Sequence, residues 1–413
     1  MARLPVADAL ASVLPRQTRV EAYDGSAAGP VDAEVVFRVT SAKVLSHLVS
    51  APGELGMARA YVSGELDIDA PDHYTLLRAL SRTKMADLTP AERLQVFRSL
   101  GREAMHWVEP PPQEVGAKRY VAGLRRHSKG RDALAIAHHY DVSNEFYSWV
   151  LGPSMAYTCA VYPTDEATLE QAQYEKFDLV CRKLGLQSGM RLLDVGCGWG
   201  GMALHAAEHY GVEVIAVTLS REQAQFGANA AADRGLAVDI RFSDYRDVTE
   251  SGFDAISSIG LTEHIGIAQL PSYAQFLADK LLPQGRLLNH CITRPDDHSP
   301  AISKRGFIPR YVFPDGELPG VGRIVGALQR AGLEVRHDEN LREHYAKTLQ
   351  AWCDNLDAHW EQAVAEVGIG TARVWALYLA GSRIGFETNQ IQLHQVLATK
   401  TSAGVSGMPL RGW

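Results

Sequence analysis

The segment with the clearest chemical potential is a glycine-rich turn in the middle of the chain. An apolar run from Leu192 to Val195 carries the acid Asp194 and ends in the letters Gly-Cys-Gly-Trp-Gly-Gly at 196–201. Glycines let a ligand approach the backbone closely, and the helix that the turn opens offers free N–H groups at its start. The letters also satisfy the GxGxxG pattern, so the turn alone fits either S-adenosylmethionine (SAM) or a dinucleotide.

The residues after the next apolar run separate these two ligands. A dinucleotide fold wants an acid about 20 residues further on, at the end of the following strand, to hold the ribose hydroxyls. Here Val217 is followed by Thr218, Leu219 and Ser220. An acid before the first glycine and a later one at a strand end, Asp244, are instead typical of SAM-binding sheets. The pattern therefore favours SAM.

Short β-rich runs alternate with helical ones from Met190 onward, and they must position this turn. Such alternation is typical of a doubly wound parallel sheet, so we expect a Rossmann-like α/β fold here. The predicted strands span 191–195, 212–219, 238–242, 253–259 and 285–292, and the predicted helices include 201–209 and 221–234.

Length and composition indicate the number of domains and the class of protein. With 413 residues, the chain is long enough for two domains or three. Its 46% hydrophobic and 22% charged residues and its net charge of -7 are those of a globular protein without a nucleic-acid partner. No apolar run reaches the roughly 18 to 20 residues of a membrane span, and no signal peptide is recognisable, so a cytoplasmic location is expected. The scattered cysteines predict reduced thiols and no metal site.

A proline run at 110–112 predicts a domain boundary, because proline restricts both itself and the preceding residue. The mixed pattern before it predicts a smaller α+β domain. After it, basic residues gather within 118–131. They form either a solvated helix face or a patch that meets anionic lipid headgroups, each residue contributing about 1 kcal/mol near a charged surface.

Several blocks make the chain resemble the cyclopropane fatty acid synthases, which include bacterial phospholipid enzymes and mycolic acid cyclopropane synthases. The resemblance covers roughly Ala137 to the C-terminus. Its blocks are 138–144, 157–160, 192–200, 218–220 with Gln223, 244–247, 260–266, 311–314, and 344–346 with Thr348 and Leu349.

The resemblance implies a class I SAM-dependent methyltransferase domain at 137–413, a basic linker at 111–136 and an N-terminal domain at 1–110. That last domain is similar to the lipid-engaging domain of the longer, phospholipid-acting members. This similarity implies that the protein associates peripherally with the inner face of the cell membrane and that its substrate is a bilayer phospholipid. Segments 51–69 and 306–319 resemble an actinobacterial branch whose relatives make 10-methylene and then 10-methyl stearate.

The resemblance also implies two sets of site residues. Those expected to bind SAM are Tyr157, Thr158, Leu192, Leu193, Asp194, Val195, Gly196, Cys197, Gly198, Trp199, Gly200, Thr218, Leu219, Ser220, Gln223, Tyr245 and Arg246. A bicarbonate ion is the second expected ligand of the family. Its expected ligands, of which all but Ile292 are also the expected catalytic residues, are Cys159, Glu263, His290, Tyr345 and, through its backbone, Ile292.

The implied chemistry explains these residue types. An isolated alkene is a poor nucleophile, so the site must hold it against the sulfonium methyl in a dry pocket. Methyl transfer leaves a carbocation, and a base must then take a proton from the new methyl so that the ring closes. Bicarbonate suits that role if a thiol, an imidazole and a phenol hold its charge, while Glu263 accepts its hydroxyl proton.

Each expected catalytic residue also has a structural interpretation. Cys159 fits a small buried hydrophobe, the commonest role of a free cysteine. His290 and Cys291 are neighbours on a predicted core strand, where a histidine is usually a satisfied core residue. Tyr345 fits simple packing in a helix, and Glu263 fits a helix cap.

Other residues are assigned to packing. Trp199, Trp352 and Trp375 are expected in the core, whereas the aromatic segment 307–313 is a candidate wall of an acyl channel. A cysteine once proposed as the nucleophile in this family falls at Ser382, so a packing role is expected there.

The sequence leaves several functions open. Cyclopropane formation and 10-methylene formation share the same first step. A non-catalytic lipid-binding protein and a methyltransferase with a polar small-molecule acceptor are rivals of other classes. A homodimer and a downstream reductase are candidate partners.

Overall fold

The computed structural model describes residues 5–12, 14–51, 53–81, 107–114, 143–298, 306–314 and 316–411. The basic segment 118–131 and residues 138–142 of the first resemblance block lie outside this part of the chain. By its packing, the chain forms two compact units. The first comprises 1–119, 303–314 and 352–384, and the second comprises 120–302, 315–351 and 385–413. The domain limits expected from the sequence stay a prediction; packing joins 303–314 and 352–384 to the unit that holds the N-terminal segment.

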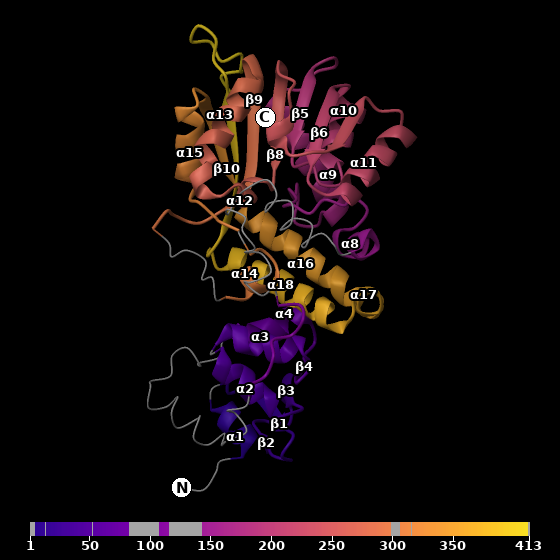
Figure 1. The fold of residues 1–413 in the computed structure, drawn as a ribbon, viewed down its shortest axis with the longest axis vertical. Helices are drawn as coiled ribbons and strands as arrows, with labels where there is room; N and C mark the ends of the chain where they lie inside the picture. The colour runs from indigo at the N-terminus through magenta and orange to yellow at the C-terminus, as the bar shows by residue number, and fades with distance from the viewer. Residues whose placement is uncertain are drawn as a thin grey trace. The chain divides into compact units, whose positions relative to one another are not determined.

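The first unit contains a four-stranded sheet of order β2-β1-β3-β4, in which β1 and β3 are parallel and both outer pairs are antiparallel (Figure 1). In β3 the buried residues Val35, Phe37 and Val39 alternate with less buried ones, the period of a strand with one face in a core. This part has the expected α+β character. Its elements are α1 (Val6–Ala11), β1 (Thr18–Ala22), β2 (Ala27–Ala28), β3 (Val35–Val39), α2 (Lys43–Ser50), α3 (Glu54–Val62), β4 (Leu66–Asp69) and α4 (His73–Ser81).

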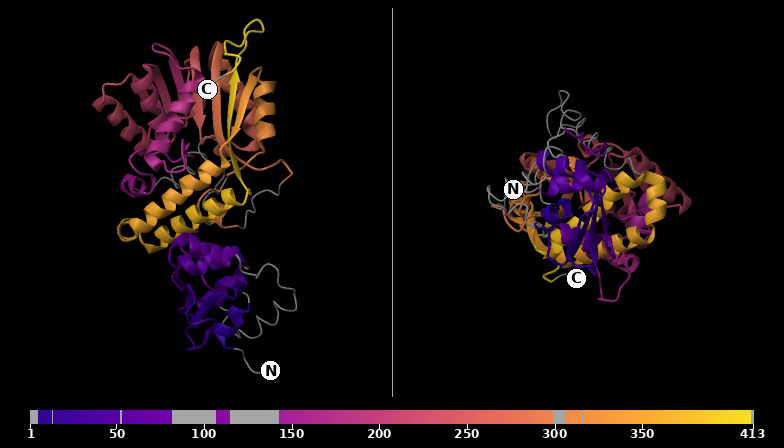
Figure 2. Two further views of the ribbon diagram at one scale, coloured as in Figure 1. Left: turned by 180° about the vertical axis from the view of Figure 1, so that it is seen from behind. Right: turned by 90° about the horizontal axis from the view of Figure 1, so that it is seen from below.

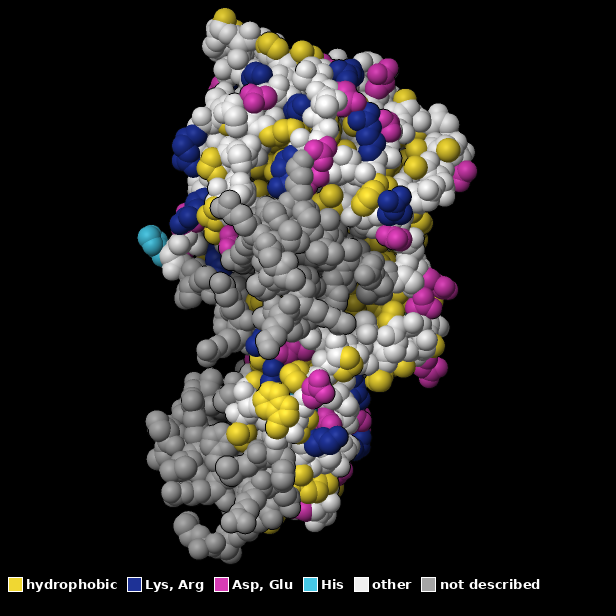
Figure 3. Space-filling view, in the orientation of Figure 1, with side chains coloured by type: hydrophobic (Ala, Val, Ile, Leu, Met, Phe, Trp, Pro, Cys, Tyr) yellow, Lys and Arg dark blue, Asp and Glu magenta, His cyan; other side chains and the backbone are white. Residues whose placement is uncertain are grey.

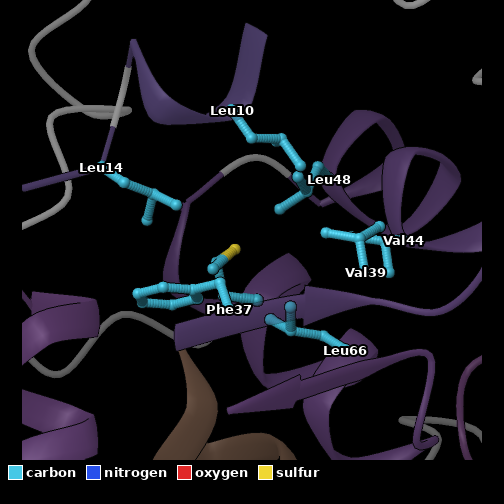
Figure 4. Close-up of a pocket in the computed structure, with 8 residues that line it drawn as sticks. Leu10, Leu14, Phe37, Val39, Val44, Leu48 and Leu66 are labelled. Atoms are coloured by element: carbon cyan, nitrogen blue, oxygen red, sulfur yellow. The ribbon is translucent and has the colours of Figure 1, made fainter. Parts of the chain in front are cut away.

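A small apolar pocket lies in the core of this sheet and its helices (Figure 4). Every lining side chain is aliphatic, aromatic or a thioether, so the pocket offers contacts only to hydrocarbon. The lining residues are Leu10, Leu14, Phe37, Val39, Val44, Leu48, Met57 and Leu66.

Ion pairs join distant segments within the first unit. Arg59 donates to both carboxylate oxygens of Glu114, at 2.6 and 2.7 Å. Arg373 donates to the Tyr61 carbonyl at 2.7 Å and to Asp67 at 2.9 Å. Residues from the N-terminal, proline-rich and C-terminal helical segments therefore share one set of contacts. The later helices that contribute to this unit are α14 (Phe307–Tyr311), α16 (Arg342–Ala358) from residue 352 on, α17 (Trp360–Val367) and α18 (Ile369–Glu387) up to residue 384.

The second unit is built on a seven-stranded sheet of order β10-β11-β9-β8-β5-β6-β7. Strands β9, β8, β5, β6 and β7 are parallel to one another, and β11 runs antiparallel between β9 and β10. All five predicted strands are confirmed: three have the predicted ends, β6 is one residue shorter at each end, and β9 begins four residues earlier and ends one residue later. The strands are β5 (Arg191–Val195), β6 (Glu213–Thr218), β7 (Val238–Phe242), β8 (Phe253–Ile259), β9 (Leu281–Thr293), β10 (Glu334–Asn340) and β11 (Gln392–Thr399).

Helices cover both faces of this sheet (Figures 1 and 2). Adjacent residues of β5 point to opposite faces: Leu192 packs with α9 and α10, whereas Leu193 packs with α13 and α15. Both core layers are buried, as expected for a doubly wound sheet. The helices are α8 (Asn144–Leu151), α9 (Leu169–Leu184), α10 (Gly201–Tyr210), α11 (Arg221–Asp233), η3 (Tyr245–Asp247), α12 (Thr262–Ile265), η4 (Ile267–Gln269), α13 (Leu270–Lys280) and α15 (Val321–Arg330).

The described surface carries mixed charge. In the face shown in Figure 3, acidic and basic side chains lie interspersed among apolar ones. Among the described residues, no helix combines the length and the apolar character needed to cross a bilayer.

Candidate active site

The residues predicted to bind SAM follow the carboxyl ends of neighbouring parallel strands. The glycine turn follows β5, Thr218 ends β6, and Tyr245 lies just beyond β7. Parallel strands bring their carboxyl ends to one edge of a sheet, where α/β proteins bind ligands. The backbone N–H groups of Gly196 and Cys197 donate to the Val217 carbonyl at 2.9 and 3.0 Å, which fixes the turn against β6.

Two glycines of this turn are required by both conformation and space. Gly196 has a φ of +79° and Gly200 one of +87°, a region that other residues rarely adopt. A Cβ on Gly200 would lie 2.7 Å from the Ile240 Cδ1 atom, and one on Gly196 would lie 3.1 Å from Leu261 Cβ. The turn therefore passes close to its neighbours before α10 begins.

The segments after β6 and β7 are held by their own hydrogen bonds. Thr218 Oγ1 donates to Gln223 Oε1 at 2.8 Å, and Ser220 caps α11 by accepting from the Gln223 amide. Arg246 donates to both oxygens of Asp244, at 2.7 and 2.6 Å. The predicted ligand residue Arg246 thus already has a carboxylate partner.

Thr158, which precedes α9 in the sequence, lies at the same end of the sheet. A Cβ on Gly260, which follows β8, would lie 3.0 Å from Thr158 Cγ2. Two α9 side chains hold Thr158: Gln173 Nε2 donates to its carbonyl at 2.9 Å, and Lys176 Nζ donates to its hydroxyl at 3.0 Å. The neighbouring Tyr157 ring lies 5.9 Å from that of Tyr147.

Asp194 and Lys176 are buried charges in this region. Asp194 Oδ1 accepts from Ser257 at 2.7 Å, whereas Oδ2 has no hydrogen-bond partner among the described residues. Burial raises the Asp194 pKa to about 6 and lowers the Lys176 pKa to about 7. A carboxylate oxygen without a partner next to the glycine turn suits an N–H donor of a bound ligand.

Backbone groups at the ends of β10, β11 and β9 link the predicted bicarbonate ligands. The Leu341 carbonyl accepts from the Cys159 thiol at 3.8 Å and from the Tyr345 amide at 3.1 Å. The Leu341 amide donates to Leu393, which lies opposite Ile292 in the sheet. Residues from widely separated positions are therefore neighbours in this unit.

Glu263 joins this cluster through Ile292. Its Oε1 atom accepts from the Ile292 amide at 2.7 Å, and its Oε2 atom is buried without a partner among the described residues. Burial raises the Glu263 pKa to about 7. The Ile292 N–H group that was expected to hold an ion is therefore engaged by Glu263 in this structure.

The other predicted catalytic groups are buried. Cys159 and His290 are both fully buried, and Tyr345 packs with its ring centroid 4.4 Å from that of Phe386. Burial raises the pKa of the Cys159 thiol and lowers that of His290 well below its usual value. Cys159 thus keeps its proton, and His290 is neutral. Its Nε2 atom has no hydrogen-bond partner in the described part of the chain.

Lys176, Lys183 and Gln395 contact these clusters and were missed in the sequence. A signal exists for the lysines: both stand at core-facing positions of the amphipathic helix α9, seven residues apart. The expected burial of Trp199, Trp352 and Trp375 is confirmed. Ser382 is half-buried, and its packing role stays a prediction.

Known proteins resemble this chain over most of its length. A family model described as mycolic acid cyclopropane synthetase matches residues 127–396, which include every residue of both clusters. The chain is 55% identical over 402 residues to a probable fatty acid methyltransferase of Mycobacterium tuberculosis, with 95% of this chain and 93% of that protein covered. It is 32% identical over 352 residues to the cyclopropane-fatty-acyl-phospholipid synthase of Escherichia coli K12, with 84% of each covered.

A solved structure extends this similarity to the fold. The mycolic acid cyclopropane synthase CmaA1, complexed with SAH and CTAB, superimposes with a TM-score of 0.61 and 32% identity. The superposition covers 64% of this chain and 97% of that one.

Proposed function

Because the chain belongs to the mycolic acid cyclopropane synthetase family, we propose that it methylates the cis double bond of an unsaturated acyl chain on a membrane phospholipid, giving a cyclopropane. The predictions of family, class I methyltransferase fold and SAM-dependent enzyme class are confirmed. Methyl transfer from SAM to a lipid acyl chain follows from the family. The acceptor position, the product and the base are the proposed part.

The observation that carries the proposal is a pair of buried polar atoms, Glu263 Oε2 and His290 Nε2, that have no partner among the described residues. Both lie by the carboxyl end of β9, which contains His290 and where Glu263 accepts from the Ile292 amide. Buried polar atoms are nearly always paired, so these two atoms suit contact with a bound polar ligand. We assign SAM to the glycine turn, to the 218–223 segment, to Tyr157 and Thr158, and to Tyr245 and Arg246. The lipid double bond would then meet the methyl group above the second cluster, by which we mean the predicted bicarbonate ligands Cys159, Glu263, His290, Ile292 and Tyr345.

The second cluster fits a small anion with one acidic proton. The neutral His290 ring and the Tyr345 phenol offer donors to its negative charge. The Cys159 thiol donates to backbone carbonyls in this structure and would turn its proton to the anion when the anion binds. Glu263 offers an acceptor for its hydroxyl proton, provided that Glu263 is ionised. When bound there, bicarbonate would supply the base that removes a proton from the transferred methyl.

Each bond that forms in the proposed reaction is matched by a bond that breaks. A carbon–carbon bond forms between the methyl group and one alkene carbon while the sulfur–methyl bond breaks, and the other alkene carbon becomes cationic. Loss of a proton from the methyl frees an electron pair that closes the ring. The residues around the cation contribute by excluding water and by fixing the geometry.

The alternative product is a 10-methylene acyl chain. It starts from the same cation, but hydrogen migrates between the two former alkene carbons before the methyl loses its proton. The resemblance of segments 51–69 and 306–319 to the branch that makes 10-methyl stearate supports it, and a reductase would then complete the product. A phospholipid bilayer as partner, peripheral membrane binding from the cytoplasmic side, a lipid-engaging role for the N-terminal segment and a homodimer belong to the same proposal.

Purified protein incubated with SAM and oleoyl phospholipid vesicles tests the proposal. We expect an acyl chain that is one methylene unit heavier, and NMR of the product separates ring protons from an exocyclic alkene. Unchanged lipid with intact SAM binding would support a lipid-binding protein instead. Methylation of polar small molecules alone would support the other rival.

A further inference from the structure

Behind the second cluster, a chain of fully buried polar side chains leads to His290. Gln395 lies directly opposite His290 in the pairing of β11 with β9, and its Nε2 atom is 3.2 Å from His290 Nδ1. On its other side, Lys183 Nζ donates to Gln395 Oε1 at 2.7 Å. All three side chains have no exposed surface, so their neighbours in the protein determine their hydrogen bonds.

Lys183 determines which way the Gln395 amide points. An ammonium group has donors and no acceptor, so the amide oxygen must face it. The amide nitrogen then faces His290. A flipped amide would set two donors against each other in the core, at a cost of about 1 to 3 kcal/mol or more.

Glu339 keeps Lys183 in place. Lys183 Nζ forms an ion pair with a carboxylate oxygen of Glu339 on β10, whose side chain is partly exposed. The hydrogen-bonded side chains therefore follow one another as the Glu339 carboxylate, the Lys183 ammonium, the Gln395 amide and the His290 imidazole. Each group fixes the orientation of the next.

This order specifies the tautomer of His290. The Gln395 N–H donates to Nδ1, so Nδ1 must present its lone pair. A neutral imidazole carries one proton, which is then on Nε2. That nitrogen is the buried atom without a partner among the described residues.

We propose that Lys183 and Gln395 are positioning residues that hold His290 as an Nε2–H donor for the anion that takes up the proton. The role of this donor rests on the proposed function, whereas the tautomer does not depend on it.

Nitrogen NMR of the protein with ring-labelled histidine reads the tautomer directly. The protein has 15 histidines, so the His290 signals are assigned by their loss in His290→Gln. We expect a protonated nitrogen at Nε2 and a bare one at Nδ1, without lipid or bicarbonate present. A proton on Nδ1 would overturn the inference and leave the methyl-transfer proposal untouched, whereas absent lipid product would do the reverse.

Two variants test whether Gln395 and Lys183 set the tautomer of His290. Gln395→Glu offers His290 a carboxylate, so the proton should move to Nδ1. Lys183→Met removes the donor that orients the amide, so both tautomers should become populated. Gln225→Glu, the same replacement on the exposed face of α11, is the control and should leave His290 unchanged. An unchanged Nε2–H state in folded Lys183→Met and Gln395→Glu would contradict the inference.

Kinetics add a readout that packing alone would not move. Gln395→Glu should lower kcat for lipid methylation by about tenfold or more, as expected for a histidine in the wrong tautomer. Its SAM affinity, measured by calorimetry, should stay within about twofold of the parent, which also shows that the variant is folded. Full kcat in a variant with the proton on Nδ1 would contradict the role of the donor.

Discussion

The carboxylate of Glu263 accepts the backbone N–H of Ile292 at 2.7 Å while its second oxygen stays buried without a partner among the described residues. Glu263 follows β8, and Ile292 lies near the end of β9, so the bond crosses the edge of the sheet at which the predicted site residues meet. One oxygen anchors the side chain, and under the proposed function the other would accept the hydroxyl proton of the anion.

This arrangement makes Glu263 a source of instability at neutral pH. Its pKa is about 7 in the fold against the ordinary 4.5, so the folded state holds the proton more tightly than the unfolded state does. The destabilisation is absent below pH 4.5, grows between pH 4.5 and about 7, and is complete above.

Glu263→Gln keeps an acceptor for the Ile292 amide and removes the charge. We expect its free energy of unfolding to exceed that of the parent by roughly 2 to 3 kcal/mol at alkaline pH and to match it near pH 4. Denaturant unfolding across this pH range measures the difference. A pH-independent difference would contradict the raised pKa.

Cys159→Ala should separate turnover from SAM binding. The thiol lies in the second cluster and donates to backbone carbonyls, so its loss should lower kcat about tenfold while SAM affinity changes less than about twofold. Cys181→Ala, which also removes a buried thiol, is the matched control and should keep its kcat. Equal loss of SAM binding and turnover in Cys159→Ala would remove the assigned role.

Gly200→Ala should weaken SAM binding. An alanine at position 200 would have to adopt a φ of +87°, and its Cβ atom would lie 2.7 Å from Ile240 Cδ1. The turn must therefore shift. We expect at least about a tenfold rise in the Kd for SAM. Gly189→Ala is the control, because its φ is also positive at +84° but no atom lies within 4 Å of the added Cβ. Equal SAM affinity in both variants would argue against the turn as the SAM site.

Removal of bicarbonate should slow the reaction without affecting SAM binding. In buffer freed of carbon dioxide we expect lipid methylation to fall and to recover when bicarbonate is added back. Turnover that is independent of bicarbonate would contradict bicarbonate as the base and point to a protein group instead, with the Glu263 carboxylate as the candidate in the second cluster.

The strands and the glycine turn could be predicted because their signals are local. Hydrophobic runs define β5 to β9, and the glycines at 196, 198 and 200 report a backbone with positive φ. The meeting of Cys159 with Tyr345 was expected only through family resemblance, since it depends on how β10 and β11 pair.

The polar chain behind His290 could not be predicted in the same way. Lys183 and Gln395 are separated by 212 residues, and a lysine or glutamine among apolar neighbours resembles a surface position until its partner is known. Likewise, the sequence does not show the core against which the helical segment 352–384 packs.

The most direct test uses SAM with a fully deuterated methyl group and vesicles of oleoyl phospholipid. Methyl transfer followed by loss of one hydron from the methyl predicts an acyl chain with one added carbon that retains two of the three deuterons. An added carbon with all three deuterons, or an unmodified acyl chain on protein that binds SAM, would contradict the account.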